Sequence, residues 1–183
     1  MARLPYVTAD NAPEPVADAL RQMPAKVGIV NLVAHAETCL RPFLRLGQAI
    51  LTSLALPADL RELAILHTAR LSDMDYQWTQ HARLATLVGL PDGKIEAVHA
   101  GVPDPSLFSP VELAVLAFTE SVVRNGDADD ACYQAVADHL SGREIVELTM
   151  VIGFYQMLGN VMNVTRVDPE PAADVELADL SRA

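Results

Sequence analysis

Residues 60–90 read LRELAILHTARLSDMDYQWTQHARLATLVGL, and this stretch decides the fold. Apolar residues recur at three- and four-residue steps on both sides of the polar pair Ser72-Asp73, which predicts two helices, over residues 58–71 and 73–90. At 100° per residue, Glu62 lies within about 60° of the apolar face of the first helix and His81 within about 60° of that of the second. Both side chains are therefore predicted to be buried.

A carboxylate and an imidazole that both face the core suggest a common site. Burying a charged group is costly unless the group is paired or neutralised, so Glu62 and His81 are expected to approach one another or a polar cavity. In such a pair the carboxylate fixes the tautomer of the imidazole, and one of the two groups can reach a substrate. The sequence therefore predicts Glu62 and His81 as a catalytic acid–base pair.

The spacing of Glu62, Met74, Gln77 and His81 resembles the E-x11-C-x2-C-x3-H pattern of the alkylhydroperoxidase D-like branch of the carboxymuconolactone decarboxylase family. The segments LRELAILHTARL and YQWTQHARLATLVGL are similar to sequences of the family branch that lacks redox cysteines. The resemblance extends over residues 31–164. It implies an all-α helical bundle that forms a homo-oligomer, commonly a trimer or hexamer. Met74 and Gln77 stand where the peroxidase branch has cysteines, and neither forms a thiolate, so peroxidase activity is not expected.

The resemblance also implies a cofactor-free enzyme that acts on a small organic substrate. Without sulfur the relay would act directly, by decarboxylation, isomerisation or cyclisation, with carboxylated compounds and lactones as candidate substrates. Gln77 is expected to orient the substrate. The other expected substrate-binding residues are Met74, Trp78, Tyr76 and Asn31.

Each of these assignments has a structural alternative. Trp78 suits core packing equally well, Tyr76 can face away from the site, and Asn31 can serve as a helix N-cap. Binding of an anionic substrate would require an arginine at the mouth of the pocket. The candidates are Arg61, Arg70 and Arg83. A surface or salt-bridged role is favoured for each of them. There is also an alternative for the function of the whole protein. It would be a non-catalytic binding or assembly module, in which Glu62 and His81 form a buried hydrogen bond in a filled core.

Composition sets further limits. With 183 residues and 51% hydrophobic content, the chain is long enough for one domain. Its 13 basic and 24 acidic residues give a net charge of −11, which opposes nucleic-acid binding. Cys39 and Cys132 have no C-x-x-C spacing, which indicates free thiols in a reducing cytoplasm, each expected to be buried. The five histidines lack metal-binding spacing, and His67 lies about 140° from Glu62 on its helix, so no metal site is predicted.

The remaining segments predict an extended arm over residues 1–15, an all-α domain over 16–166 and an acidic tail over 167–183. Two S-x-x-E capping boxes, at Ser109 and Ser141, mark the starts of two helices. The segment 31–51 suits one helix or two helices broken near Arg41-Pro42. The other expected helices cover residues 14–23, ending near Pro24, and 110–125, 129–140 and 145–164. A turn is expected at residues 91–93, followed by a short helix to about residue 100.

The last of these segments is apolar nearly all round and is about long enough to span a bilayer. It contains Glu147, Gln156, Asn160 and Asn163, and nothing beside it resembles a stop-transfer signal. A buried core or subunit-contact helix is therefore expected, with no membrane association. Gly153 and Gly159 are expected to allow close helix approach.

Overall fold

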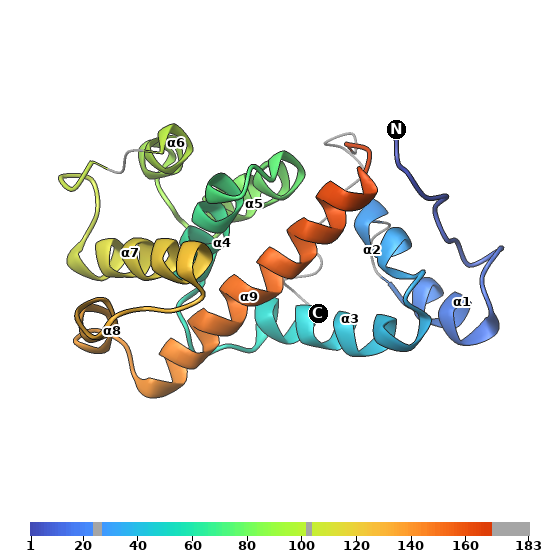
Figure 1. Ribbon diagram of the computed structural model, residues 1–183, viewed down its shortest axis with the longest axis horizontal. Helices are drawn as coiled ribbons and strands as arrows, with labels where there is room; N and C mark the ends of the chain where they lie inside the picture. Colours follow the sequence, from blue (N-terminus) through green and yellow to red (C-terminus); the bar gives the residue numbers. More distant parts are fainter. Residues whose placement is uncertain (24–26, 102–103, 170–183) are drawn as a thin grey trace. The chain divides into compact units, whose positions relative to one another are not determined.

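The computed structural model describes residues 1–23, 27–101 and 104–169, and these residues form α-helices with no β-strand (Figure 1). The prediction of an all-α protein is therefore confirmed. The helices are α1 (Glu14–Arg21), α2 (Gly28–Val33), α3 (Glu37–Thr52), α4 (Ala58–Leu71), α5 (Asp75–Leu87), α6 (Asp92–Ala100), α7 (Pro110–Asn125), α8 (Asp130–Ala137) and α9 (Gly142–Thr165).

The chain divides into two compact units, Met1–Ser53 with Asn160–Ala183, and Leu54–Gly159. Helix α9 runs without interruption from the second unit into the first. The predicted domain limits at residues 15 and 166 stay a prediction. Most of the predicted acidic tail, residues 170–183, lies outside the described residues, as does Pro24.

Helix α4 is the central element of the unit 54–159, where it contacts α5, α6 and α7. Every residue from Leu60 to Ala69 is buried, so α4 is enclosed on all sides and is less amphipathic than its sequence suggests. Glu147 of α9 accepts the backbone N–H groups of Ala55 and Leu56 (2.7 and 2.8 Å), which fixes the segment that leads into α4. The buried core of this unit includes Leu63, Leu66, Ala85, Leu90, Ile95, Val98, Phe108 and Leu116.

Both predicted capping boxes are present. The Ser109 hydroxyl accepts the Glu112 backbone N–H, and the Glu112 carboxylate accepts the Ser109 N–H. Ser141 and Glu144 make the same reciprocal contacts at the start of α9. These side chains satisfy N–H groups that a helix start leaves unpaired.

The predicted helix 31–51 is wrong in one respect, because the break lies at residues 34–36 and not near Arg41-Pro42. Pro42 lies inside α3, where its missing N–H removes only one backbone hydrogen bond. The buried residues Leu40 and Ile50 hold α3 on either side of Pro42. The N-cap alternative for Asn31 is also wrong, since Asn31 lies within α2, whose N-cap is Val27.

The N-terminal segment has no helix before Glu14 and bonds to its own chain within the first unit. Arg3 N–H donates to the Thr165 carbonyl at 2.7 Å, and Val7 N–H donates to the Asn31 carbonyl at 3.1 Å. Tyr6 and Asp168 also share a hydrogen bond between the Tyr6 hydroxyl and the Asp168 backbone N–H (2.9 Å). These bonds fix the predicted arm against the end of α9 and against α2.

The cysteine prediction is correct in part. Both thiols are free, as expected, but Cys39 is exposed and Cys132 is half-buried, so neither is the buried structural thiol that was predicted. Cys39 lies on the exposed side of α3, because Leu40 is the residue of that turn that faces inward. Burial raises the pKa of the Cys132 thiol, and the nearby Asp129 carboxylate raises it further.

Helix α9 is long and apolar enough to cross a membrane by length and composition, but 56% of its most apolar stretch is buried in the protein. That burial is typical of the core helix of a globular protein. Gly159 has the predicted role in close packing, because a Cβ there would overlap the Met74 side chain. The same prediction is wrong for Gly153, which has open space around it among the described residues.

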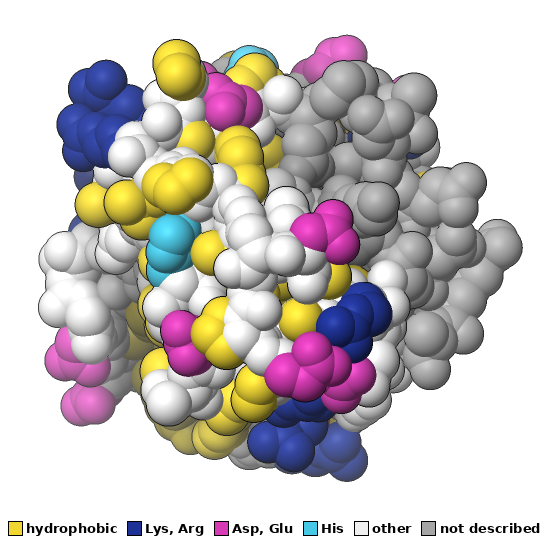
Figure 2. All heavy atoms as spheres, turned by 90° about the vertical axis from the view of Figure 1, so that its right-hand side faces the viewer, with side chains coloured by type: hydrophobic (Ala, Val, Ile, Leu, Met, Phe, Trp, Pro, Cys, Tyr) yellow, Lys and Arg dark blue, Asp and Glu magenta, His cyan; other side chains and the backbone are white. Residues whose placement is uncertain are grey.

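Charges on the described surface are mixed. On the face in Figure 2, Lys and Arg side chains form separate groups with acidic and hydrophobic side chains among them. Nucleic-acid binding requires a continuous basic surface. The prediction that the protein does not bind nucleic acid stays a prediction, and this face offers no such surface among its described residues.

Candidate active site

Glu62 and His81 meet in the interior of the unit 54–159. Glu62 is fully buried on α4, and His81, 7% exposed, comes from α5. His81 Nδ1 lies 2.7 Å from Glu62 Oε2, the distance of a strong charge-assisted hydrogen bond. The predicted burial and pairing of these residues are confirmed, while their catalytic role stays a prediction.

The second oxygen of Glu62 also has a partner. Arg61 Nε donates to Glu62 Oε1 at 3.0 Å, so the carboxylate lies between a guanidinium and an imidazole. Arg61 is itself only 7% exposed. Of the two roles considered for Arg61, ion pairing is the one observed, and a buried ion pair of this kind keeps the Glu62 side chain in one orientation.

The contact with Glu62 determines how His81 can act. A carboxylate accepts hydrogen bonds, so Nδ1 carries the hydrogen of the neutral ring and Nε2 is left as the basic nitrogen. The ring meets Tyr155 of α9 edge to face, with centroids 4.7 Å apart and planes at 85°. Burial raises the pKa of Tyr155 well above its usual value, and the charge of Glu62 raises it further, so Tyr155 remains a neutral phenol.

Gln77 brings a buried amide to the same side of α5 as His81, because the two residues are four positions apart. Its side chain is 1% exposed, yet neither the amide nitrogen nor the amide oxygen has a hydrogen-bond partner among the described residues. Leaving a buried polar group unsatisfied costs about 1–3 kcal/mol. Such a group is therefore expected where a ligand or water supplies the partner.

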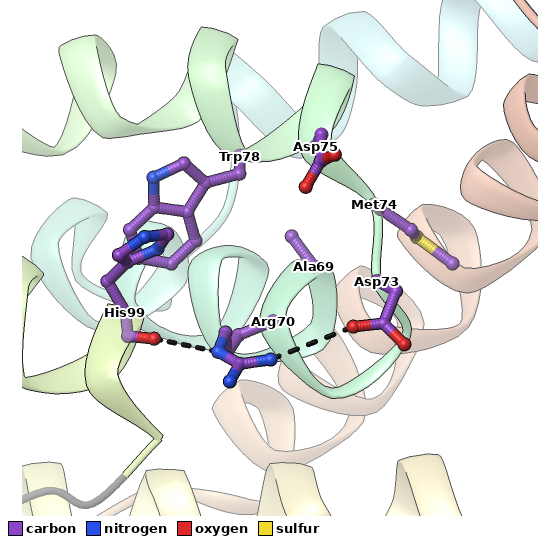
Figure 3. Close-up of a pocket in the computed structure, with 7 residues that line it drawn as sticks. All are labelled: Ala69, Arg70, Asp73, Met74, Asp75, Trp78 and His99. Atoms are coloured by element: carbon purple, nitrogen blue, oxygen red, sulfur yellow. Dashed lines mark hydrogen bonds and ion pairs between the residues drawn. The ribbon is translucent and has the colours of Figure 1, made fainter.

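A pocket of about 130 Å³ opens where the α4–α5 turn meets the end of α6 (Figure 3). Met74 and Trp78, both predicted to bind substrate, line it, but Glu62 and His81 do not. Trp78 packs against His99, with ring centroids 4.7 Å apart. The other lining residues are Ala69, Arg70, Asp73 and Asp75.

The remaining predicted site residues are dispersed. Tyr76 is half-buried and is not among the residues that line this pocket. Arg83 is exposed on α5. Asn31 belongs to the other unit, so its predicted place in the site stays a prediction.

The histidines give no sign of a metal centre in the part of the chain that the structure describes. No three His, Cys, Asp or Glu side chains lie close enough there to hold an ion. His67 is buried because α4 is enclosed on all sides. Its Nδ1 has no hydrogen-bond partner among the described residues. Burial lowers the pKa of His67; the Glu120 charge raises that pKa and the Arg124 charge lowers it.

Two features of the site were not predicted. The direct bond from Arg61 to Glu62 was missed because neighbouring residues on a helix normally point about 100° apart. Tyr155 was missed because an aromatic residue in an apolar helix gives no signal that distinguishes a site residue from a core residue. Its contact with His81 depends entirely on how α9 packs in this unit.

Comparison with solved structures places this all-α arrangement in a known class. The chain has the alkylhydroperoxidase D-like fold, which is the fold of the carboxymuconolactone decarboxylase family. No model of a known protein family matches the sequence, and a search of curated proteins finds no match either. The similarity of this chain to known proteins is therefore found in its structure and not in its sequence.

Three solved structures illustrate it. An uncharacterised peroxidase-related protein from Ralstonia eutropha, with an alkylhydroperoxidase AhpD core, is 17% identical, with a TM-score of 0.76 and 92% of each chain covered. The debrominase Bmp8, as a cysteine-to-alanine variant in complex with 2,3,4-tribromopyrrole, is 16% identical, with a TM-score of 0.75, 98% of this chain and 100% of that chain covered. A peroxidase-related protein from Silicibacter is 16% identical, with a TM-score of 0.68, 80% of this chain and 78% of that chain covered. At these identities the comparisons show the fold alone.

Proposed function

We propose that the protein is a cofactor-free enzyme that moves a proton on a small organic substrate, with Glu62 and His81 as its acid–base pair. The observation that carries the proposal is the 2.7 Å hydrogen bond between the buried Glu62 carboxylate and His81 Nδ1. A buried ionisable pair is costly compared with an apolar replacement, and clusters of this kind are common at catalytic sites.

The contacts assign a role to each side chain. Arg61 holds Glu62, and Glu62 holds the His81 ring with Nε2 as the base. Nε2 removes a proton from carbon next to a carbonyl, and the positive charge that develops on the ring is balanced by Glu62. The unpartnered Gln77 amide is available to donate to the oxygen of the resulting enolate.

Isomerisation and cyclisation next to a carbonyl start with loss of this proton and give an enolate. Decarboxylation of a 3-oxo acid releases carbon dioxide and leaves an enolate, which the protonated His81 ring supplies with a proton, so one relay serves each of these reactions. We propose a lyase or isomerase on that basis, with small carboxylated compounds and lactones as the substrates to test first. The solved structures with this fold include a debrominase and peroxidase-related proteins, which supports an enzymatic role for the fold. Thiol chemistry is disfavoured because Met74 and Gln77 occupy the positions where the resemblance places cysteines.

Deuterium exchange tests the proton-transfer step before the full reaction is known. The protein is incubated in D2O with a panel of small lactones, 3-oxo acids and cyclic ketones, and loss of the acidic C–H signal is followed by proton NMR. We expect enzyme-dependent exchange on at least one compound, reduced by about 100-fold or more in His81→Gln. His139, which is exposed on the segment after α8, provides the matched control His139→Gln, for which exchange is unchanged.

Exchange that persists in His81→Gln would contradict the proposal. A panel without exchange, together with a His81→Leu variant that is folded and more stable than the wild type, would favour the non-catalytic binding or assembly module. Turnover of an alkyl hydroperoxide with a dithiol donor, abolished by Cys39→Ser or Cys132→Ser, would instead identify a thiol peroxidase.

We also propose that the protein forms a homo-oligomer, a trimer or hexamer, through α9. Three apolar side chains of α9 in the unit 54–159 are 48–60% exposed, and their spacing places them within about 40° of one another around the helix. They are Val146, Met150 and Met157. Light scattering tests this directly: an oligomer is expected for the wild type and a smaller species for Met150→Glu with Met157→Glu, whereas a monomeric wild type would contradict it.

A further inference from the structure

The pocket lined by Trp78, Arg70 and Asp75 is a separate feature from the Glu62–His81 pair (Figure 3). We propose that this pocket binds a small organic cation, an ammonium group carried on a flat apolar body. This function is additional to the proton-transfer chemistry and does not depend on it.

The charges in the pocket favour a cation. Arg70 is already engaged, because its Nε donates to the His99 carbonyl at 2.7 Å and its NH1 lies 3.7 Å from Asp73. Asp75, in contrast, makes no side-chain hydrogen bond or ion pair among the described residues. Its carboxylate points into the pocket above Ala69, as Figure 3 shows. Asp75 is therefore the carboxylate of this pocket that has no ion-pair partner among the described residues.

The walls favour a flat apolar body beside that charge. The Trp78 indole forms one side of the pocket with the His99 ring, and the Met74 thioether lies on the other side (Figure 3). An aromatic face attracts a cation through its quadrupole, by about 0.5–1 kcal/mol at an exposed site. A carboxylate next to an indole is the combination that recognises a substituted ammonium ion.

The pocket is also held in shape by its own contacts. Asp73 has a φ of 50°, a left-handed conformation that is uncommon outside glycine and that sharpens the turn between α4 and α5. The Arg70 bond to the His99 carbonyl ties that turn to the end of α6. Gly101 follows α6 with a φ of 74°, and a Cβ there would lie 3.5 Å from the Arg70 guanidinium. A preformed pocket lowers the cost of ordering on binding.

The experiment uses Trp78, which is the only tryptophan of the chain and reports directly on this pocket. Benzylamine, benzyl alcohol and benzoate have the same ring and differ in charge, and each is titrated into the full-length protein while tryptophan fluorescence is recorded. We expect saturable binding of benzylamine, at least tenfold weaker binding of benzyl alcohol, and no saturation with benzoate. Benzyl alcohol that binds as well as benzylamine, or benzoate that binds better, would overturn the proposal.

Variants at two equivalent positions test the carboxylate. Asp75 and Asp92 are both exposed and are the first residues of α5 and α6, so Asp75→Asn and Asp92→Asn change the net charge equally. We expect Asp75→Asn to weaken benzylamine binding at least tenfold and Asp92→Asn to leave it within twofold. Equal weakening by both variants would show a general charge effect and overturn the proposed site. Circular dichroism verifies that both variants are folded, and an Asp75→Glu variant with restored binding would confirm the need for the charge.

Discussion

Two glutamates of the unit 54–159 are buried, and each has a basic partner, yet their surroundings differ. Glu112 of α7 accepts from Lys94 Nζ, from the Ser109 N–H and from the Ser109 hydroxyl, at 2.6–2.8 Å. Among the described residues, Glu62 of α4 accepts from Arg61 and His81 only, and the second nitrogen of the His81 ring takes no part in these bonds. Close by on α5, the Gln77 amide lacks any partner among the described residues.

The difference distinguishes a structural carboxylate, Glu112, from the carboxylate that we propose for catalysis, Glu62. Every partner of Glu112 belongs to a helix start or to a neighbouring helix, so its network caps α7 and fixes α6 against it. The Glu62 cluster ends in the His81 imidazole, and four residues before His81 on α5 the Gln77 amide has no hydrogen-bond partner among the described residues. Buried polar groups without a full set of hydrogen bonds lower the stability of a protein. They are expected at functional sites, where activity requires such groups.

The largest effect is expected for Glu62→Ala. The change leaves the Arg61 guanidinium buried without its carboxylate, which costs about 3–5 kcal/mol in unfolding free energy. Urea denaturation of the purified protein measures the loss. In the double variant Arg61→Leu with Glu62→Leu the loss should be much smaller than the sum of the single variants, because the pair is removed as a unit. Additive losses would show that the ion pair is not energetically coupled.

A smaller loss, about 2 kcal/mol, is expected for Glu112→Gln. The amide retains the acceptor for Ser109 but loses the ion pair with Lys94, which is only 20% exposed. The proposed deuterium-exchange activity should be unchanged, since this network is structural. Loss of activity without loss of stability would break the distinction between the two carboxylates.

Gln77→Leu should increase stability by about 1–2 kcal/mol. The substitution replaces a buried amide that has no described partner by an apolar side chain of similar size, which removes a desolvation penalty. Thermal unfolding measures the gain, and the deuterium-exchange assay should show reduced activity in the same variant. A loss of stability would mean that the amide is satisfied in the folded protein, and Gln77 would then belong with the structural groups.

The Glu62–His81 pair could be predicted from the sequence, because the direction in which a side chain leaves a helix depends only on its position along that helix. Two residues that face the apolar sides of adjacent helices are brought together if those helices pack, and α4 and α5 do. Residues 58–71 are helical as predicted, and the capping boxes were correct for the same reason, since each depends on side chains three residues apart.

Features that depend on packing between distant segments were not predictable in this way. A salt-bridged role was among those expected for Arg61, but its burial was not, because it follows from the packing that encloses α4 on all sides. Trp78 and Met74 lie near His81 in sequence, but the pocket that they line does not include His81 or Glu62. The exposed Cys39 and the helix that continues through Pro42 were misjudged from residue preferences alone.

Acid should weaken the Glu112 network. Burial alone would raise the Glu112 pKa, but the hydrogen bonds from Lys94 and Ser109 lower it below its ordinary value of 4.5. A carboxyl group with a lowered pKa stabilises the folded state above about pH 4.5, and this contribution is lost as the pH falls through the folded-state value. The stability difference between wild type and Glu112→Gln should therefore shrink below pH 4.5. Urea denaturation from pH 3 to pH 7 tests this, and a constant difference would contradict it.

The smallest effects concern the two capping serines, which have the same motif in different surroundings. Ser109→Ala removes the hydroxyl that donates to the buried Glu112 and should cost about 1 kcal/mol. Ser141→Ala, at the exposed start of α9, should cost about 0.5 kcal/mol, because water can replace the hydroxyl there. The larger loss at Ser109 should also diminish when Glu112 is already replaced by Gln, since the two side chains form one network. Equal losses at the two serines would show that burial of the carboxylate adds nothing to the cap.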